Sequence, residues 1–364
     1  MRSEPRIAFV IDSLPSLGGG EKVLLTALEI YPRAEIFTLV YNRECFLHTP
    51  IAQKDVHTSF IDSIPFAHRQ HRFFLPLMPS AIERLDLTGF DVVMCFSYAV
   101  AHGVKKYDGA RHLSYMFTPM RYAWTDINLN GTHSPKNILL NGFMRAFRRW
   151  DCAAASRVDA FATISHAVAN RIADPYRRFA PVIHPRVEVE RFSASKTREN
   201  FYITVSRLVP HKRIDLVVQA FSQLNLPLLV VGDGAELPRL QDMAASNIHF
   251  LGYASDEQVA QLLGKARGFV CMAEEDFGIA IVEAQAAGCP VLAFGQGGAL
   301  ETVVSGVTGV FFPEQSVTSL VDAILNFENQ SGRFQSQDMI QNARKYSKQN
   351  FIEKFRSFVE QATS

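Results

Sequence analysis

The stretch AEEDFGIAIVEAQAAGCP at residues 273–290 decides how this sequence is interpreted. It holds two glutamates, Glu275 and Glu283, with seven residues between them, and it follows an apolar, strand-like run at 268–272. The pattern predicts a loop that runs into a helix, and a fully helical spacing would separate the two acids by about 12 Å. Two carboxylates so placed can accept hydroxyl hydrogen bonds from both ends of a nucleotide sugar without a metal. A surface helix with one exposed acid and one acid near its positive end fits the same spacing.

The bulk composition limits the classes of protein to consider. The chain has 364 residues, 48% of them hydrophobic, which is enough for two domains with separate cores. Lysine and arginine (37) balance aspartate and glutamate (36), so the charge does not favour nucleic acid as a partner. Five cysteines without a CxxC pair argue against a zinc or redox framework and are typical of a reducing compartment. Without a signal peptide or a run of ~20 apolar residues, we expect a cytoplasmic protein that at most lies on a membrane surface.

Short apolar runs alternate with amphipathic segments, which predicts parallel sheets with crossover helices. Helical periodicity is clear at 213–223, 255–266, 316–327 and 338–361, and the polar segment 186–200 is a natural linker. The predicted fold is α/β, with two Rossmann-like doubly wound domains at 1–186 and 187–337 that face each other across a cleft. The C-terminal helix, 338–364, is expected to pack back on the first domain. The expected strands are 6–12, 35–41, 91–97, 112–117, 160–165 and 181–185 in the first half, and 201–206, 228–232, 248–252, 268–272, 290–294 and 309–312 in the second.

Two basic residues lie at the end of the strand expected at 201–206. Arg207 follows this strand directly, and Lys212 precedes the next helix. Ligands of doubly wound sheets bind at the carboxyl ends of the strands. An arginine fork and a mobile ammonium suit the two phosphates of a nucleoside diphosphate, although two surface cations would give the same pattern.

A glycine run, Gly18, Gly19 and Gly20, follows the first strand and precedes a helix. Glycines there let the backbone approach an anion closely, although any tight turn would also use them. The run lacks the GK[ST] of a P-loop, and Val23 replaces the third glycine of the dinucleotide fingerprint, which disfavours a dehydrogenase. A GDG sequence at 232–234 repeats the strand-end position, with a plain turn as the better interpretation of Asp233. The eleven histidines form no HExxH or HxH arrangement, so no metal site is expected.

Several segments in register resemble the donor-binding half of family-4 glycosyltransferases, which are retaining enzymes of the GT-B fold. These are FYITVSRLVPHKRIDLVVQAF, LLVVGDGAEL, IHFLGYASDEQVAQLL, AEEDFGIAIVEAQAAGCPVLAFGQGGALETV and GVTGVFF. The first half agrees through its glycine loop, TPMRYAW (118–124), RVDAFATIS and the Arg-Phe pair at 191–192. The TPMRYAW segment resembles the branch that builds bacterial surface polysaccharides such as O-antigen or exopolysaccharide, and these enzymes are often mannosyltransferases.

The resemblance implies that the first domain binds the acceptor and the second binds the nucleotide-sugar donor. Arg207 and Lys212 would hold the donor diphosphate and stabilise the leaving nucleotide. Glu275 would bind hydroxyls of the transferred sugar, and Glu283 would bind the ribose. The expected mechanism retains the anomeric configuration by front-face attack, without a metal, a cofactor or a protein nucleophile; the nucleotide sugar is a co-substrate.

The resemblance also implies donor contacts from main-chain groups. Backbone amides around Phe277, Gly278 and Ile279 would lie at a helix start and donate to sugar or phosphate. The loop at Gly19 and Gly20 would close over the phosphates from the opposite domain.

One position departs from the family pattern. The branch usually has a histidine before the Thr-Pro of TPMRYAW, in contact with the donor sugar, and here that residue is Phe117. A phenyl ring packs but cannot donate a hydrogen bond, so the departure affects this contact and the choice of sugar. The family's Asn-Ser after strand 160–165 is also changed, to Ser165-His166.

Two segments interleave basic and aromatic residues. FAHRQHRFFLPLMP (66–79) contains Arg69 and Arg72, and FMRAFRRWD (143–151) contains Arg145, Arg148 and Arg149. Such faces can rest on an anionic bilayer, here the cytoplasmic face of the inner membrane. A core-facing aromatic stripe with a solvated basic edge fits equally well.

These observations lead to one function and two competitors. We expect transfer of a sugar, mannose from GDP-mannose by preference, to a lipid-linked or oligosaccharide acceptor in bacterial surface polysaccharide biosynthesis. A nucleotide-sugar 2-epimerase of the same fold is the first competitor. A catalytically silent nucleotide-sugar-binding protein, suggested by Phe117, is the second.

Overall fold

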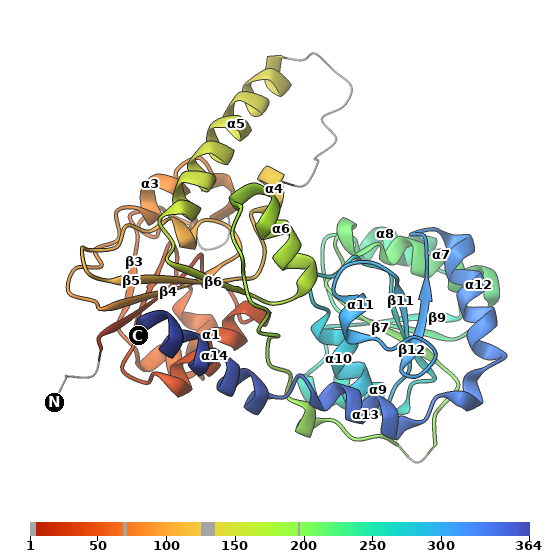
Figure 1. The fold of residues 1–364 in the computed structure, drawn as a ribbon. Helices are drawn as coiled ribbons and strands as arrows, with labels where there is room; N and C mark the ends of the chain where they lie inside the picture. The colour runs from red at the N-terminus through yellow and green to blue at the C-terminus, as the bar shows by residue number, and fades with distance from the viewer. Residues whose placement is uncertain (1–4, 68–70, 125–134, 196) are drawn as a thin grey trace. The chain divides into compact units, whose positions relative to one another are not determined.

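A computed structural model describes residues 5–67, 71–124, 135–195 and 197–364 (Figure 1). The chain forms two compact units, Met1–His184 with Ile352–Ser364, and Pro185–Phe351, and each is described by itself. The predicted boundaries lay at 186/187 and 337/338, so the second unit extends further towards the C-terminus than expected. Each unit contains one six-stranded parallel sheet, as the alternating pattern predicted.

The sheet of the first unit has the strand order β3-β2-β1-β4-β5-β6, the order of a doubly wound dinucleotide-binding fold. One predicted strand is wrong. Residues 181–185 are not a strand, and Val182 makes only an isolated bridge to Thr163. The sixth strand is instead β3, which has three residues and is too short to show a period in the sequence. The strands are β1 (Ile7–Ile11), β2 (Glu35–Thr38), β3 (Val56–Thr58), β4 (Val92–Ser97), β5 (Arg111–Met116) and β6 (Ala160–Thr163).

Helices cover both faces of this sheet because successive side chains of each strand point to opposite faces. On one face, the ring of Phe9 meets that of Phe96 at 5.3 Å, and Phe96 stacks on Phe355 of α14 at 6.0 Å. On the other face, Val10 belongs to a buried cluster with Phe147 of α5. Figure 1 shows α1 and α14 on the first of these faces and α3 and α5 on the second. The helices are α1 (Gly19–Ile30), α3 (Met78–Ile82), α4 (Arg121–Trp124), α5 (Pro135–Ser156), α6 (His166–Tyr176) and α14 (Lys348–Thr363).

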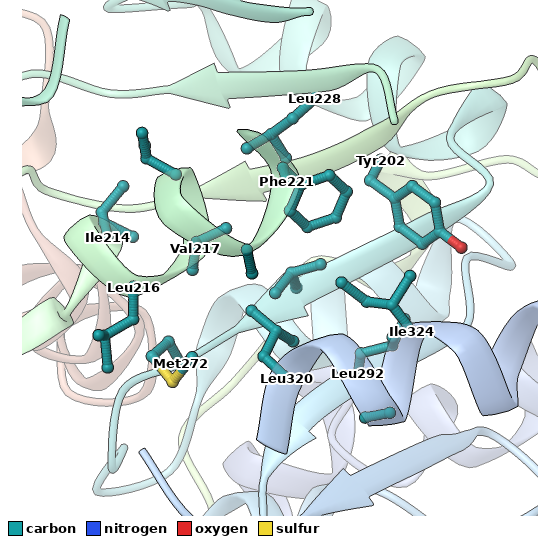
Figure 2. Close-up of a cluster of buried hydrophobic side chains, with 14 of the residues drawn as sticks. Tyr202, Ile214, Leu216, Val217, Phe221, Leu228, Met272, Leu292, Leu320 and Ile324 are labelled. Carbon is teal, nitrogen blue, oxygen red and sulfur yellow. The ribbon is translucent and has the colours of Figure 1, made fainter. Parts of the chain in front are cut away.

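The sheet of the second unit has the order β12-β11-β10-β7-β8-β9, which is the same winding. Its core on one face is a cluster in which Val217 and Phe221 of α7 and Leu320 and Ile324 of α12 pack on strand residues such as Leu292 (Figure 2). On the other side, α10 packs against α9 and α13. The strands are β7 (Tyr202–Val205), β8 (Leu228–Val231), β9 (Ile248–Gly252), β10 (Gly268–Cys271), β11 (Val291–Phe294) and β12 (Gly309–Phe312).

Three helices of this unit, α7, α9 and α12, begin and end within one residue of the predicted positions 213–223, 255–266 and 316–327. The helices are α7 (Ile214–Leu224), α8 (Leu237–Met243), α9 (Asp256–Lys265), α10 (Ile279–Ala286), α11 (Ala299–Thr302), α12 (Val317–Glu328) and α13 (Ser336–Arg344). Short 3-10 helices occur in connections of both units: η1 (Arg43–Phe46), η2 (Pro50–Gln53), η3 (His71–Phe74), η4 (Ala101–Gly103), η5 (Val189–Arg191), η6 (Pro210–Lys212) and η7 (Ser331–Arg333).

The single helix predicted for 338–361 is two helices, α13 and α14. The break lies at Tyr346, whose carbonyl accepts from Val187 N (2.8 Å) and whose hydroxyl donates to the carbonyl of Glu301 (2.7 Å). These long-range contacts replace the local helical hydrogen bonds, and periodicity along the sequence carries no sign of them. Helix α14 starts in the second unit, and its residues from Ile352 onwards belong to the first.

Candidate functional site

The topology of the second sheet brings two predicted site loops together. Strands β7 and β10 are neighbours at the middle of the sheet. From β7 the strand order continues outward to β8 and β9, and from β10 it continues outward on the other side to β11 and β12. This is the switch point at which ligands of doubly wound sheets bind, at the carboxyl ends of the strands. The loop after β7 carries Arg207 and Lys212, and the loop after β10 carries Glu275.

Lys212 and Glu275 form an ion pair at this position. Lys212 Nζ lies 2.6 Å from Glu275 Oε1, and the two side chains are only 18% and 23% exposed. Gly298 anchors the loop that carries Glu275, since Gly298 N donates a hydrogen bond to the carbonyl of Glu275 at 2.7 Å. The sequence predicted both residues as ligand contacts; the structure places their charged groups in contact with each other.

The ion pair lies at the wall of a narrow pocket of about 20 Å³, lined also by Ser206, Cys271 and Gly278. That volume is close to the minimum for one water molecule. A larger ligand must therefore lie over the pocket or displace the ion pair. Burial raises the pKa of the Cys271 thiol to about 12, so at neutral pH this wall residue is protonated and is not a nucleophile.

Glu283 is also paired with a cation. Arg191 Nη2 donates to Glu283 Oε1 at 3.2 Å, and Arg191 Nη1 pairs with Asp256. The predicted loop that runs into a helix is confirmed: Glu275 lies in the loop and Glu283 in α10, which begins at Ile279, so the fully helical spacing of the two acids does not apply. Arg191 was not predicted as a site residue, because it lies 92 positions before Glu283 in the sequence and only the fold brings the two together.

The start of α10 requires a glycine. Gly278 caps the helix with φ 87°, and a Cβ at this position would lie 2.8 Å from Ile281 Cδ1. Backbone amides at the start of a helix have no partner within the helix, so those of Ile279 and its neighbours can donate to a ligand. The side chain of Phe277 does not contribute in this way, because it is buried and its ring packs on Tyr346 at 5.3 Å.

Arg207 is exposed, and the loop that carries it rests on the GDG turn at 232–234. A Cβ on Gly232 would lie 1.9 Å from the carbonyl oxygen of Ser206, and a Cβ on Gly234 would lie 2.3 Å from that of Leu208. These approaches are possible only for glycine. The GDG turn therefore supports the position of Arg207.

The first unit places Phe117 against the glycine run. Helix α1 begins at Gly19, so Gly19 and Gly20 form its first turn and Gly18 is its N-cap. The loop that was predicted to contain all three glycines therefore ends at Gly18. A Cβ on Gly20 would lie 3.3 Å from the ring of Phe117, so the glycine makes room for this side chain.

Asp12 is a buried residue that the sequence analysis missed. It follows β1, and its carboxylate accepts hydrogen bonds from Tyr98 N (2.6 Å), Ala99 N (3.1 Å) and Ala101 N (2.7 Å) and from Val100 N. Burial raises the pKa of the Asp12 carboxyl, and these backbone donors oppose that shift. Its position directly after the first strand was the only signal of this role, which is to fix the loop after β4.

The two basic-aromatic segments differ in what they expose. In α5, Phe147 is buried, Phe143 and Trp150 pack against the same cluster, and Arg145 and Arg149 are exposed. The alternative of a core-facing aromatic stripe with a solvated basic edge is therefore correct for this segment.

The segment at 66–79 is different, because Phe66 and Phe73 are 65% and 80% exposed and Leu77 is also exposed. Arg69 and the side chain of Arg72 lie outside the described residues.

No helix in the described ranges is long and apolar enough to cross a membrane. Within those ranges, no three His, Cys, Asp or Glu side chains gather in a way that could hold a metal ion.

Comparisons with known proteins identify similar sequences and similar folds. The family described as "Glycosyl transferases group 1" matches residues 186–346. A GDP-mannose-dependent alpha-(1-6)-phosphatidylinositol monomannoside mannosyltransferase of Mycobacterium tuberculosis is 33% identical over 165 residues, which is 40% of this chain and 43% of that protein. A D-inositol 3-phosphate glycosyltransferase of Mycobacteroides abscessus is 31% identical over 176 residues, 42% of this chain and 39% of that protein. The chain spans about half the length of the curated relatives it matches, or less.

Solved structures resemble the whole chain. Anabaena Alr3699/HepE in complex with UDP has a TM-score of 0.72 at 18% identity, covering 98% of this chain and 100% of that one. Sucrose-phosphate synthase from Thermosynechococcus elongatus has a TM-score of 0.73 at 15% identity, covering 98% and 99%. These likenesses concern the fold. Residues 186–346 therefore form a group 1, family-4-like glycosyltransferase domain, and the two Rossmann-like units have the GT-B fold.

Proposed function

We propose that this protein is a retaining glycosyltransferase that moves a hexose, mannose by preference, from a nucleotide sugar to a lipid-linked or oligosaccharide acceptor. The contact between Lys212 and Glu275 at the switch point carries the proposal. A cation and a carboxylate in contact match the two parts of a nucleotide sugar that adjoin each other, the diphosphate and the hydroxyl-bearing ring. Each group of the ion pair exchanges its partner for one part of the donor.

The roles of the other residues follow from their positions. Arg207 binds the donor diphosphate together with Lys212, and both stabilise the charge that develops on the departing nucleotide. Glu283 binds the ribose, which requires that its contact with Arg191 loosens. The amides of Gly278 and Ile279 donate at the start of α10. The leaving phosphate takes the acceptor proton in a front-face attack, so the reaction needs no nucleophile from the protein.

The preference for GDP-mannose rests on the names of relatives. Two proteins about 30% identical over their matched segments are GDP-mannose-dependent mannosyltransferases that act on a phosphatidylinositol mannoside. These names also support a lipid-linked acceptor, and a role in bacterial surface polysaccharide biosynthesis is an extension of the same proposal. The HepE structure, in contrast, contains UDP, so the donor base needs a direct test.

A thermal-shift screen of nucleotide sugars tests the donor. A ligand that binds the folded state raises the unfolding temperature, and the largest shift is expected with GDP-mannose. A shift with a UDP-sugar and none with GDP-mannose would contradict the donor assignment. Product analysis with and without an acceptor then distinguishes transfer from epimerisation, since an epimerase forms an isomeric nucleotide sugar without an acceptor, whereas a transferase releases the free nucleotide.

A catalytically silent binding protein is the one competitor that a particular residue favours. Phe117, in place of a hydrogen-bonding histidine, fills the space beside Gly20. Slow hydrolysis of the donor in the absence of acceptor would exclude this alternative, because a silent protein leaves the sugar–phosphate bond intact.

A further inference from the structure

We propose that the second unit has an additional site for a small phosphate-class anion, separate from the one that contains Lys212 and Glu275. The site is a pocket of about 230 Å³, here called the edge pocket, and it is lined by Arg198, Glu199, Asn200, Arg267, Pro290, Phe327 and Gly332. The pocket has room for several water molecules. The proposal does not depend on the proposed transferase function.

The edge pocket lies at the amino ends of the strands. Asn200 comes shortly before β7, Arg267 directly precedes β10, and Pro290 directly precedes β11. Lys212 and Glu275 follow the carboxyl ends of β7 and β10. Because parallel strands begin at one edge of a sheet and end at the other, the length of a strand, roughly 13 Å for four residues, separates the two sites.

Arg198 carries a positive charge whose bonded partners are neutral. Its Nη1 donates to the carbonyl of Ala266 (3.3 Å), and its Nη2 donates to the hydroxyl of Ser336 (3.0 Å) and to the carbonyl of Gly288. The neighbouring Cys289 thiol does not neutralise it, because burial raises the pKa of Cys289 to about 12. Three hydrogen bonds fix the guanidinium, and an arginine has five N–H groups, so donors remain for a ligand.

Arg267 is the second cation of the pocket, and its charge is balanced by Glu328. Glu328 Oε2 pairs with Arg267 Nη2, and Glu328 Oε1 accepts from the hydroxyl of Tyr202. Figure 2 shows this hydroxyl pointing away from the hydrophobic cluster that holds the tyrosine ring. The Nε of Arg267 is buried, and nothing in the described chain accepts a hydrogen bond from it. A buried donor without a partner requires a bound water or ion.

The charges around the pocket leave an excess of one positive charge. Arg267 is paired with Glu328, and Lys265 is paired with Glu199 at 3.1 Å, which leaves the guanidinium of Arg198. Two guanidinium groups with unused donors match the oxygens of a phosphate, which arginine can bind in a fork. An inorganic phosphate or a phosphate ester therefore fits the site, and a cation does not.

Inorganic phosphate is the probe that tests the site. Thermal unfolding of the full chain is measured against phosphate concentration, with chloride at matched ionic strength as the reference. The wild-type protein should show a phosphate-specific rise in unfolding temperature. Lys212→Gln should lose only the part of this rise that comes from phosphate at the donor site and should keep the rest, because the ion pair lies at the other edge of the sheet. Complete loss of the rise in Lys212→Gln would place the phosphate at the carboxyl edge and overturn the proposal, as would a wild type that does not respond.

Gly332 provides a matched pair of variants. A Cβ added there meets no atom of the described structure within 4 Å, so a side chain can enter without a clash. Gly332→Asp places a negative charge at the rim and should weaken phosphate binding at least about tenfold, whereas the neutral Gly332→Asn of the same shape should stay within about twofold of wild type. Equal phosphate responses in these two variants would overturn the proposal. Because both are compared with their own unfolding in chloride, a change in stability alone does not affect the result.

Discussion

At the scale of single residues, Lys212 and Glu275 form an ion pair with each other. The pair neutralises two part-buried charges. Under the proposed function, a nucleotide sugar replaces both partners at once: phosphate oxygens for the lysine and sugar hydroxyls for the glutamate. A nucleoside diphosphate without a sugar takes the lysine and leaves the glutamate unpaired. This difference lets the site favour the donor over the nucleotide that leaves.

Glu275→Gln tests this exchange. Transfer should fall at least about a hundredfold, because the variant loses a charge-assisted contact to the sugar. Binding of the plain nucleoside diphosphate should be unchanged or tighter, because Lys212 is released. Single-turnover kinetics and calorimetric titration with the diphosphate measure the two effects. Glu274→Gln, which changes the neighbouring acid of the same loop, is the control. A parallel loss of transfer and of nucleotide binding in Glu275→Gln would contradict the role of Glu275 as a sugar contact.

His112 makes the stability of the first unit depend on pH. The side chain is fully buried, its Nε2 lies 3.2 Å from Cys95 Sγ, and burial lowers its pKa to about 3. In the unfolded chain its pKa is about 6.5, so between pH 6.5 and 3 the unfolded state binds the extra proton. The contribution of neutral His112 to the free energy of unfolding is fully present above pH 6.5. It decreases as the pH falls towards 3, by up to about 1.4 kcal/mol per pH unit.

Urea unfolding at several pH values measures this slope. His112→Gln cannot take up a proton, so its free energy of unfolding should fall less steeply below pH 6.5 than that of the wild type. His249→Gln, at an exposed position, should keep the wild-type slope. Identical slopes in wild type and His112→Gln would show that His112 is not the group that titrates.

At the scale of elements, the acidic loop depends on how α10 begins. Gly278→Ala combines a positive φ with a Cβ 2.8 Å from Ile281 and should destabilise the unit by about 2–4 kcal/mol. Gly306→Ala is a matched control with φ 73° and no neighbour of the new Cβ within 4 Å in the described structure, so it should cost only about 1–2 kcal/mol. Donor binding should weaken only in Gly278→Ala. Denaturant unfolding and donor titration of both variants measure these outcomes, and equal effects would mean that the helix start is not critical.

The elements also show what sequence patterns can and cannot predict. Strands such as β1 and β10 are buried on both faces and read as continuous apolar runs, so they were predicted correctly. The three-residue strand β3 has no detectable period, and the break at Tyr346 depends on contacts with distant residues. The same distinction holds in the site: the strand-end positions of Lys212 and Glu275 follow from alternating strands and helices, whereas the pairing of Glu283 with Arg191 arises only in the fold.

At the scale of the whole molecule, we expect the exposed side chains of Phe66, Phe73 and Leu77 to contact a membrane surface that holds a lipid-linked acceptor. Phe73→Ser should reduce co-sedimentation with anionic vesicles at low salt, by about threefold or more, because an aromatic side chain at the bilayer surface is lost. Phe179→Ser removes an equally exposed phenyl ring outside this segment and should not change binding. If the wild-type protein stays entirely in the supernatant, the membrane contact is wrong.

The path of the chain between the two units has a consequence for biosynthesis. The second unit, Pro185–Phe351, is continuous in sequence, whereas the first unit is completed only by Ile352–Ser364, with Phe355 against Phe96 and Tyr115. During translation, the N-terminal sheet therefore leaves the ribosome long before the aromatic side chain that covers one of its faces is synthesised. The unit made second can finish folding first, and the unit made first must wait, with part of its core uncovered, for residues 352–364.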